Sequence, residues 1–244
     1  MDVYHIFASY YDQLEPGLGI LAGVLLKRLD EGHLCLDLKS LDEDYPEEKI
    51  PDAILDEGPY LSHDPSALTP FILYQGNLYF QRYFLYETHI ENKIRQLITE
   101  GNKLRDQRIQ QLKPFHLLIE ELFRENTHAF QPALLDNFCI VTGGPGTGKT
   151  TMVREVLGVL YAIDPGLKVA LAAPTGKAAA RINESMTPLR EKVPGLPLAS
   201  TIHRLLGSVA GSVFFRHNQD NPLIHDITIV DEASMIDGAL MAKL

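Results

Sequence analysis

The feature that most constrains the fold is a glycine-rich segment placed between an apolar run and a helical pattern. The stretch "NFCIVTGGPGTGKTT" occupies residues 137–151 and contains Gly143-x-x-x-x-Gly148-Lys149-Thr150. Its first half is typical of a buried strand, and "TTMVREVLGVLYAI" after it shows helical spacing of apolar residues. A strand, a glycine loop and a helix in this order indicate a P-loop. The sequence therefore predicts a bound phosphate chain where the helix begins.

The residue types of this loop match the needs of a phosphate ligand. Glycines let successive backbone N–H groups turn inward, and the start of the helix adds positive charge. Lys149 is expected to reach the β- and γ-phosphates, and the Thr150 hydroxyl is expected to bind Mg²⁺. A glycine turn without a ligand is the alternative interpretation. The predicted nucleotide-binding residues are Gly143, Gly144, Pro145, Gly146, Thr147, Gly148, Lys149, Thr150 and Thr151.

A second element supplies two adjacent carboxylates. The stretch "ITIVDEAS" is an apolar, β-branched run that ends in Asp231-Glu232. In α/β sheets ligands bind at the carboxyl ends of the strands, so both side chains should lie near the phosphate site. Asp231 is expected to hold Mg²⁺ with Thr150, and Glu232 to orient and deprotonate an attacking water. Lys149, Asp231 and Glu232 are the predicted catalytic residues of a hydrolase.

The rest of the chain divides into two predicted domains. Strands alternate with helices from residue 138 onward, which together with the P-loop predicts an α/β fold of the P-loop NTPase type with a parallel sheet. A smaller, mainly helical domain precedes it. There we expect helices over residues 5–14 and 18–30, strand-like alternation of leucines over 34–38, an irregular segment over 42–70, a β-hairpin turned at Gly76-Asn77, and a helix over about 86–111. The predicted domains are residues 1–113 and 114–244, with the boundary near Pro114.

The net charge of −10 is concentrated at the front of the chain. Residues 1–60 hold 14 of the 32 acidic residues and only 4 of the 22 basic ones, so the remainder is electrically balanced. The acidic segment would repel a nucleic-acid backbone and is suited to solvent or to a protein partner. The balanced remainder can carry local basic contacts.

Other classes of protein are not favoured. Cys35 and Cys139 are far apart and belong to no CxxC or Cys/His cluster, so neither a zinc site nor a disulfide framework is expected. No apolar run approaches the ~20 residues that span a bilayer. We expect a reduced, cytoplasmic setting and no membrane partner.

Two further segments combine small, hydroxylated and basic residues at expected helix starts. In "LAAPTGKAAARI" a strand ends and a helix begins, and "ASTIHRLLG" presents a second helix start. Such groups can hold the phosphates of a nucleic acid. An alanine-rich core helix with exposed basic ends is the alternative for the first segment, and a cap or core histidine for the second. The predicted nucleic-acid-binding residues are Pro174, Thr175, Gly176, Lys177, Thr201, His203 and Arg204.

Taken in order, these segments resemble a known family. "TGGPGTGKTT", "AAPTGKAAARI", "STIHRLLG" and "IVDEASMID" resemble motifs I, Ia, Ib and II of superfamily 1 helicases, specifically of the RecD family, the α-subunits of exodeoxyribonuclease V. "GHLCLDLKSL" and "TPFILYQGNLYFQRYFLYE" are similar to the amino-terminal domain that in this family packs against the other subunits. The resemblance covers nearly the whole chain and is most specific from Val141 to Asp237.

The resemblance implies an activity, cofactors and partners. It implies an ATP-dependent DNA motor that moves 5′ to 3′ on single strands within a recombinational-repair nuclease–helicase, using ATP and Mg²⁺. The expected partners are single-stranded DNA, along the two segments named above, and the other subunits of the complex.

The sequence departs from the family pattern in two places. The family usually has an adenine-recognising glutamine well before the P-loop, whereas Gln131 lies only 12 positions before Gly143, so adenine selectivity is not predicted. The chain also ends at Leu244, before the strand that normally inserts beside the Asp-Glu strand and before a second RecA-like domain with its arginine. We therefore expect a fragment that binds ATP and Mg²⁺ but hydrolyses ATP poorly.

Two other functions remain open from the sequence. One is a nucleotide-binding assembly module whose acidic front docks to partner proteins and whose P-loop serves as a structural switch. The other is a P-loop kinase, which Glu232 disfavours because a carboxylate after Asp231 suits activation of water better than transfer to an acceptor.

Overall fold

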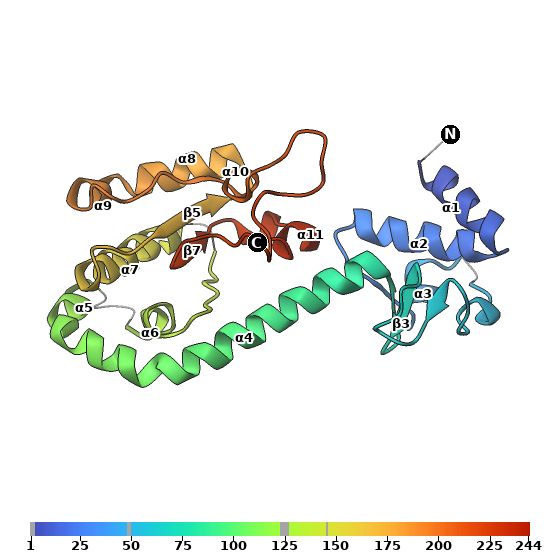
Figure 1. Cartoon of the computed structure of the whole chain (residues 1–244), viewed down its shortest axis with the longest axis horizontal. Coiled ribbons are helices and arrows are strands. Elements are labelled where there is room, and N and C mark those ends of the chain that lie inside the picture. Colours follow the sequence, from blue (N-terminus) through green and yellow to red (C-terminus); the bar gives the residue numbers. More distant parts are fainter. Residues whose placement is uncertain (1–2, 48–49, 123–126, 145) are drawn as a thin grey trace. The chain divides into compact units, whose positions relative to one another are not determined.

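The computed structural model describes residues 3–47, 50–122, 127–144 and 146–244 and falls into two compact units. The first unit is Met1–Glu91 with Asp237–Ala242, and the second is Asn92–Ile236 with Lys243–Leu244. The units divide inside α4 (Gln81–Leu112), which runs continuously through this point (Figure 1). The predicted domain boundary near Pro114 stays a prediction. No helix among the described residues is long and apolar enough to cross a membrane.

The first unit begins with two packed helices, α1 (Val3–Leu14) and α2 (Leu18–Asp30), which confirms the predicted helices. The chain reverses between them at Gly17, whose φ of 95° lies in the left-handed region. The Asp12 carboxylate accepts a hydrogen bond from the Gly17 N–H at 2.7 Å and so stabilises the turn. One face of α2 is fully buried, because Leu21 and Leu25 have no exposed surface.

A small sheet of four described strands completes the core of this unit. Among the described residues, β1 (Leu36–Asp37), β2 (Leu61–Ser62), β3 (Phe71–Tyr74) and β4 (Asn77–Phe80) pair in the order β1-β4-β3-β2. The β2–β3 pair is parallel and the others are antiparallel. The segment expected to be irregular also contains α3 (Leu41–Asp44) and the 3₁₀ turn η1 (Asp52–Ile54). Phe71, Leu78 and Phe80 of the sheet pack against α2.

The predicted hairpin is confirmed, but its turn lies one residue earlier than expected. Gln75 and Gly76 form the two-residue loop, with φ of 53° and 82°, and Asn77 already pairs with Tyr74. A tight hairpin of this kind needs positive φ at both central residues. Gly76 meets this need at the second position, so Gln75 has to adopt it at the first.

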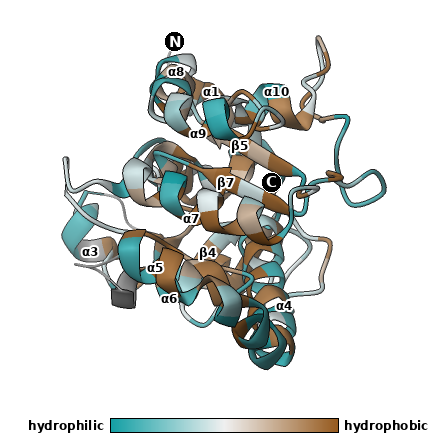
Figure 2. Ribbon diagram, turned by 90° about the vertical axis from the view of Figure 1, so that its left-hand side faces the viewer, coloured by the Kyte–Doolittle hydropathy of each residue, from teal (hydrophilic) through white to brown (hydrophobic). Residues whose placement is uncertain are grey.

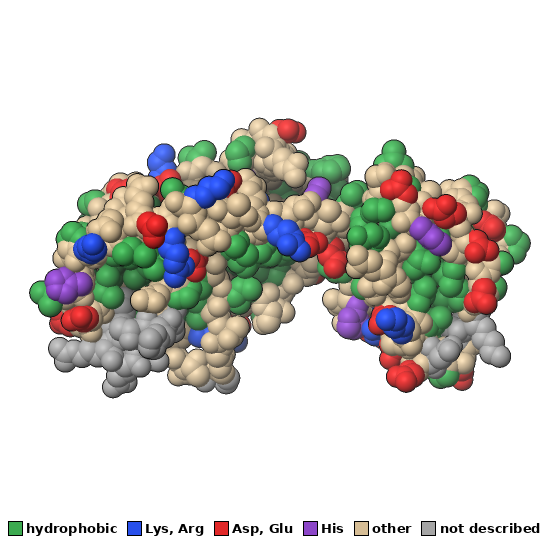
Figure 3. Space-filling view, turned by 90° about the horizontal axis from the view of Figure 1, so that it is seen from below, with side chains coloured by type: hydrophobic (Ala, Val, Ile, Leu, Met, Phe, Trp, Pro, Cys, Tyr) green, Lys and Arg blue, Asp and Glu red, His purple; other side chains and the backbone are tan. Residues whose placement is uncertain are grey.

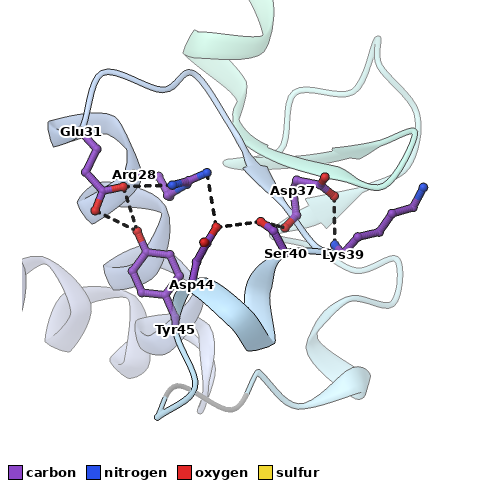
Figure 4. Close-up of polar contacts among 7 residues, drawn as sticks. All are labelled: Arg28, Glu31, Asp37, Lys39, Ser40, Asp44 and Tyr45. Atoms are coloured by element: carbon purple, nitrogen blue, oxygen red, sulfur yellow. Dashed lines mark hydrogen bonds and ion pairs between the residues drawn. The ribbon is translucent and has the colours of Figure 1, made fainter.

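Polar contacts join α2 to the segment that follows β1, as Figure 4 shows. Arg28 forms ion pairs with Glu31 at 3.1 Å and with Asp44 at 3.6 Å. The Ser40 hydroxyl donates to Asp44 at 2.8 Å, and the Tyr45 hydroxyl donates to Glu31 at 3.3 Å. These contacts give partners to some of the acidic side chains of this unit, and Figure 3 shows other Asp and Glu side chains at the molecular surface.

The second unit is organised around α7 (Lys149–Ile163). The predicted helix over about 86–111 is confirmed, although α4 starts earlier, at Gln81. After it come the 3₁₀ turn η2 (Lys113–Phe115), α5 (His116–Leu122) and α6 (Thr127–Leu135). Val156 and Val159 of α7 pack against Phe130 and Leu134 of α6. The opposite face of α7, with Leu157 and Tyr161, packs toward the sheet.

The predicted parallel sheet is present. Among the described residues, β5 (Val169–Ala173), β6 (Ser200–Thr201) and β7 (Ile227–Val230) pair in parallel in the order β6-β5-β7. α8 (Gly176–Ser185) packs against β5, and Figure 2 shows β5 and β7 largely in the brown of apolar residues. The residues of β5 are all buried, whereas those of β7 are half-buried or exposed. The remaining elements are α9 (Thr187–Lys192), α10 (Ile202–Leu206), η3 (Ala233–Met235) and, in the first unit, α11 (Gly238–Met241).

One strand prediction is wrong. Residues 138–142, which lead into the glycine loop, form no strand, and Ile140 is 72% exposed. A strand needs a neighbour to accept and donate its backbone hydrogen bonds, and no described residue pairs with this segment. In the described part of the chain β7 pairs only with β5, so its other edge has no neighbouring strand. The apolar composition of residues 138–142 predicted a β-strand, but a strand forms only where another strand pairs with it.

Candidate nucleotide and DNA-binding sites

Two glycines of the predicted phosphate loop adopt left-handed backbone conformations. Gly146 and Gly148 have φ of 75° and 81°, and an added Cβ at either would meet nothing within 4 Å. The backbone conformation, rather than crowding, therefore explains these glycines. Gly148 is the N-cap of α7 and offers no side chain to its first turn, so the N–H groups there stay available to an anion. Pro145 lies outside the described residues.

Two side chains close the loop on itself. Lys149 Nζ donates to the carbonyl oxygens of Gly143 at 2.6 Å and Gly144 at 2.8 Å. The Thr147 hydroxyl also donates to Gly144 O, at 2.9 Å. The lysine ammonium is thus held over the loop, where a phosphate oxygen can replace the two carbonyls as its acceptor.

The end of β7 meets the start of α7. The Thr150 hydroxyl donates to Asp231 Oδ2 at 3.3 Å, although the two residues are 81 positions apart. Asp231 is fixed from the sheet side as well, because its N–H donates to Ala172 O at 3.1 Å. Its other carboxylate oxygen accepts the Glu232 N–H at 2.9 Å. The sequence prediction that places Thr150 and Asp231 together is matched by this contact.

Hydroxyl and carboxylate oxygens are the ligands that Mg²⁺ prefers, and this ion commonly takes only one or two protein ligands besides water and phosphate. The Thr150 and Asp231 oxygens fit that donor set. The described residues contain no cluster of three or more His, Cys, Asp or Glu side chains able to hold a metal by themselves. A magnesium ion here would therefore need a phosphate chain as a further ligand.

Glu232 adopts an unusual backbone conformation directly after β7. Its φ of 55° and ψ of 39° are left-handed, which costs a non-glycine residue about 1–3 kcal/mol. The side chain is exposed, and the chain continues into η3 through a hydrogen bond from Met235 N to Glu232 O at 3.0 Å. Glu232 is thus held by the backbone next to Asp231 while its carboxylate remains open to water.

The glycine loop is an open surface. Gly143, Gly144 and Thr147 are exposed, whereas Lys149 and Thr150 are half-buried. Two cavities of about 300 and 270 Å³ are lined by other residues, one near Tyr161 and His225 and one near Arg105 and Asp136. A phosphate chain would therefore lie on the loop rather than inside either cavity.

The predicted DNA-binding residues gather at the carboxyl ends of β5 and β6. Ala173 pairs with Thr201, so the segment Pro174–Lys177 and the start of α10 follow adjacent strand ends. Thr175 and Thr201 are the N-caps of α8 and α10, and each hydroxyl oxygen accepts one helix N–H at 3.2 Å. Each hydroxyl proton is then free to be donated to a phosphate oxygen.

The basic side chains of these segments face solvent. Lys177, His203 and Arg204 are exposed, and Gly176 has open space around it. The His203 ring lies edge-on to Phe215 at a centroid distance of 5.7 Å, so an aromatic side chain from the following loop adjoins this surface. Motif spacing alone did not point to Phe215.

Comparisons with known proteins identify relatives of this chain. A family model described as "AAA domain" matches residues 126–244. The chain is 33% identical to "RecBCD enzyme subunit RecD" of Mycolicibacterium smegmatis, over 96% of this chain and 44% of that protein. It is 38% identical to the protein of the same name from Haemophilus influenzae, over 75% of this chain and 31% of that protein. The chain belongs to the RecD family.

A third relative matches a shorter part of the chain. The "ATP-dependent RecD2 DNA helicase" of Deinococcus radiodurans is 48% identical over 43% of this chain and 13% of that protein. The chain spans less than half the length of the curated RecD relatives described above. Family membership therefore fixes the kind of fold, whereas the activity of a whole RecD protein is a matter for proposal here.

Within this RecD-family chain, several structural residues could not be found from motifs. Arg108 of α4 donates to Leu135 O at 2.7 Å and to Asn137 Oδ1 at 2.5 Å, and Arg105 pairs with Asp136. These contacts hold the chain just before residues 138–142. No sequence pattern connects α4 to this segment, because the contacts join residues that are far apart in the chain.

Proposed function

We propose that this chain is the ATP- and DNA-binding part of an ATP-dependent 5′-to-3′ DNA helicase that serves as the motor subunit of a recombinational-repair nuclease–helicase complex. The glycine loop with Lys149 binds the triphosphate, and Thr150 with Asp231 holds Mg²⁺. Glu232 acts as the base toward water. The two segments at the ends of β5 and β6 bind single-stranded DNA.

One observation carries the nucleotide part of this proposal. The 3.3 Å contact between Thr150 and Asp231 brings together the helix after the glycine loop and the strand before the acidic pair. The two residues belong to different elements and are 81 positions apart in the chain. Their convergence at the carboxyl end of the sheet is the arrangement that a P-loop hydrolase uses for its metal.

The roles of the residues follow from their positions. Lys149 would exchange its two carbonyl acceptors for phosphate oxygens and neutralise their charge. Bound Mg²⁺ would supply charge stabilisation for the developing negative charge of the phosphates. Asp231, oriented by Ala172 and Thr150, would remain a fixed acceptor. Glu232 is exposed beside it and can accept a proton from water.

The DNA part of the proposal is supported by charge and hydroxyl placement. Lys177 and Arg204 present exposed positive charges beside the hydroxyls of Thr175 and Thr201. Phosphate contacts of this kind position a single strand without reading its sequence. The proposal therefore expects binding that is insensitive to base sequence and weakens as salt increases.

We further propose that the 244-residue chain by itself hydrolyses ATP slowly. Residues 138–142 enter the glycine loop without sheet pairing in the described structure, so the loop is anchored mainly through α7. In enzymes of this type an arginine supplied across the site contributes about 10³–10⁵ in rate. Brisk, DNA-stimulated hydrolysis by the 244-residue chain would contradict this part.

The test of the metal site measures affinity for a fluorescent ATP analogue with and without Mg²⁺. We expect Mg²⁺ to tighten binding to the wild-type chain, and we expect Thr150→Val and Asp231→Asn each to remove most of that effect. Thr99→Val is the matched control, because Thr99 is likewise a helical threonine whose hydroxyl donates a hydrogen bond, in this case to Arg95 O at 2.8 Å and away from the loop. Equal Mg²⁺ dependence in all four proteins would contradict the proposal.

The alternative function is a nucleotide-binding assembly module without motor activity. The variant Lys149→Ala distinguishes it from the motor. In the complete complex, Lys149→Ala should abolish DNA-stimulated ATP hydrolysis and unwinding if the chain belongs to a motor. With an assembly module, the Lys149→Ala complex would still assemble and its activity on DNA would be unchanged.

A further inference from the structure

A partly buried polar contact joins the two segments that we propose to bind DNA. Asn183 lies near the end of α8, and its carboxamide faces the backbone of Ala199, just before β6. Asn183 Oδ1 accepts the Ala199 N–H at 2.8 Å, and Asn183 Nδ2 donates to Ala199 O at 3.2 Å. One side chain thus satisfies both backbone polar groups of a residue that is only 8% exposed.

A second side chain braces this contact. Arg190 of α9 donates from Nη2 to Asn183 Oδ1 at 3.3 Å and to Pro197 O at 3.4 Å. Its Nη1 donates to Asn183 O at 3.4 Å. Arg190 Nε is buried without a hydrogen-bond partner among the described residues, so the hydrogen bonds of this guanidinium run through Nη1 and Nη2. Asn183 therefore has little freedom to rotate away from Ala199.

The position of this contact links it to the proposed DNA path. α8 begins with the segment Thr175–Lys177 and carries Asn183 at its other end. Ala199 directly precedes Ser200 and Thr201, which form the two-residue strand β6, and Thr201 caps the helix that holds His203 and Arg204. Such a short strand has few ladder hydrogen bonds to β5. The two hydrogen bonds from Asn183 add a second attachment to the same segment.

We propose that Asn183, braced by Arg190, is a positioning residue that fixes the distance between the two DNA-binding segments. It contacts no DNA itself and acts through Ala199 on Thr201 and Arg204. The inference rests on the proposed function, because it assigns a role within the same single-strand path. Loss of the carboxamide frees the chain before β6, so that Arg204 no longer lies at the spacing set by Lys177.

The test measures binding of a fluorescein-labelled oligothymidylate by anisotropy, with affinity for a fluorescent nucleotide measured on the same proteins. The 244-residue chain is used as wild type and as Asn183→Ala, Arg204→Ala and the double variant. Asn92→Ala is the matched control, an exposed asparagine in α4. Asn183→Asp serves if Asn183→Ala fails to fold, because it keeps the acceptor for Ala199 N–H and the Arg190 contact but loses the donor to Ala199 O.

We expect Asn183→Ala to weaken oligothymidylate binding about 5-fold or more, within the range of coupling between residues of one contact network. Nucleotide affinity should change by less than about 2-fold. In the double variant the two effects should be less than multiplicative, because part of the positioning effect passes through Arg204. If Asn183→Ala only lowered the stability of the fold, it would weaken the binding of both oligothymidylate and nucleotide. Its effect on oligothymidylate binding would then multiply with the effect of Arg204→Ala.

The outcomes separate the inference from the function on which it rests. If wild type binds and Arg204→Ala binds weakly, but Asn183→Ala and Asn183→Asp bind as wild type does, the positioning role is wrong and the DNA path stands. Multiplicative effects in the double variant also overturn the positioning role. If wild type does not bind oligothymidylate, the proposed DNA path itself is wrong.

Discussion

Gly148 offers a quantitative test of the glycine loop, because the cost of its backbone conformation can be separated from any steric effect of an added side chain. Its φ is 81°, and an added Cβ would contact nothing within 4 Å. Gly148→Ala therefore creates no steric overlap and changes only backbone energy. Placing an L-residue in the left-handed region costs about 1–2 kcal/mol. The reduced freedom of the unfolded chain offsets about 0.4–1 kcal/mol of this.

The expected net loss in the free energy of unfolding is therefore about 1 kcal/mol. For a chain of this size that corresponds to a fall in Tm of about 2–4 °C. The matched control is Gly195→Ala, where an added Cβ also meets nothing within 4 Å but the backbone is outside the left-handed region. Thermal unfolding followed by circular dichroism measures both variants, and nucleotide binding is measured alongside.

Gly148→Ala should also weaken nucleotide binding, because the first N–H groups of α7 depend on the backbone at this position. Gly195→Ala should leave nucleotide binding unchanged. If the two variants show the same Tm and the same nucleotide affinity, the left-handed conformation of Gly148 is not part of a phosphate site, and the reasoning fails.

Three other predictions concern packing, exposure and support of the loop. Leu157→Ala removes a side chain with no exposed surface and should cost about 2–5 kcal/mol of stability, measured by denaturant unfolding; a loss below 1 kcal/mol would contradict the described core. Iodoacetamide should modify the exposed Cys139 before the half-buried Cys35 in the native chain, as measured by mass spectrometry, and equal rates would show that residues 138–142 are covered. Burial raises the pKa of both thiols. Because the thiolate is the reacting form, the modification rates of both cysteines should still increase with pH above the pKa of an ordinary thiol. Arg108→Met should increase amide exchange around Asn137 and weaken nucleotide binding, and unchanged exchange there would show that this arginine does not hold the entry to the loop.

The sequence predicted those parts of the second unit that depend on local signals. Positive φ requires glycine at Gly148, and the helical spacing after it predicts α7. The apolar runs of β5 and β7 are recognisable because both faces of β5 are buried. The contact between Thr150 and Asp231 could be inferred as well, since parallel strands bring their carboxyl ends to one edge of the sheet.

Other features depend on contacts between distant residues and could not be predicted. Residues 138–142 have the composition of a buried strand, yet pairing decides whether such a run becomes one. The parallel pairing of β2 with β3 arises from a segment whose turn residues predicted only irregular structure. The attachment of Ala199 by Asn183 is equally hidden, because asparagine near the end of a helix is ordinarily a surface residue.

The most direct test of the account is a crystal structure of the chain with a non-hydrolysable ATP analogue and Mg²⁺. The account predicts the ion at about 2.1 Å from Thr150 Oγ1. It also predicts Asp231 bonded to the ion directly or through a water, and Lys149 Nζ moved from the loop carbonyls to the phosphates. A bound nucleotide whose magnesium ion lies away from both Thr150 and Asp231, or a glycine loop that remains closed on Lys149, would contradict it.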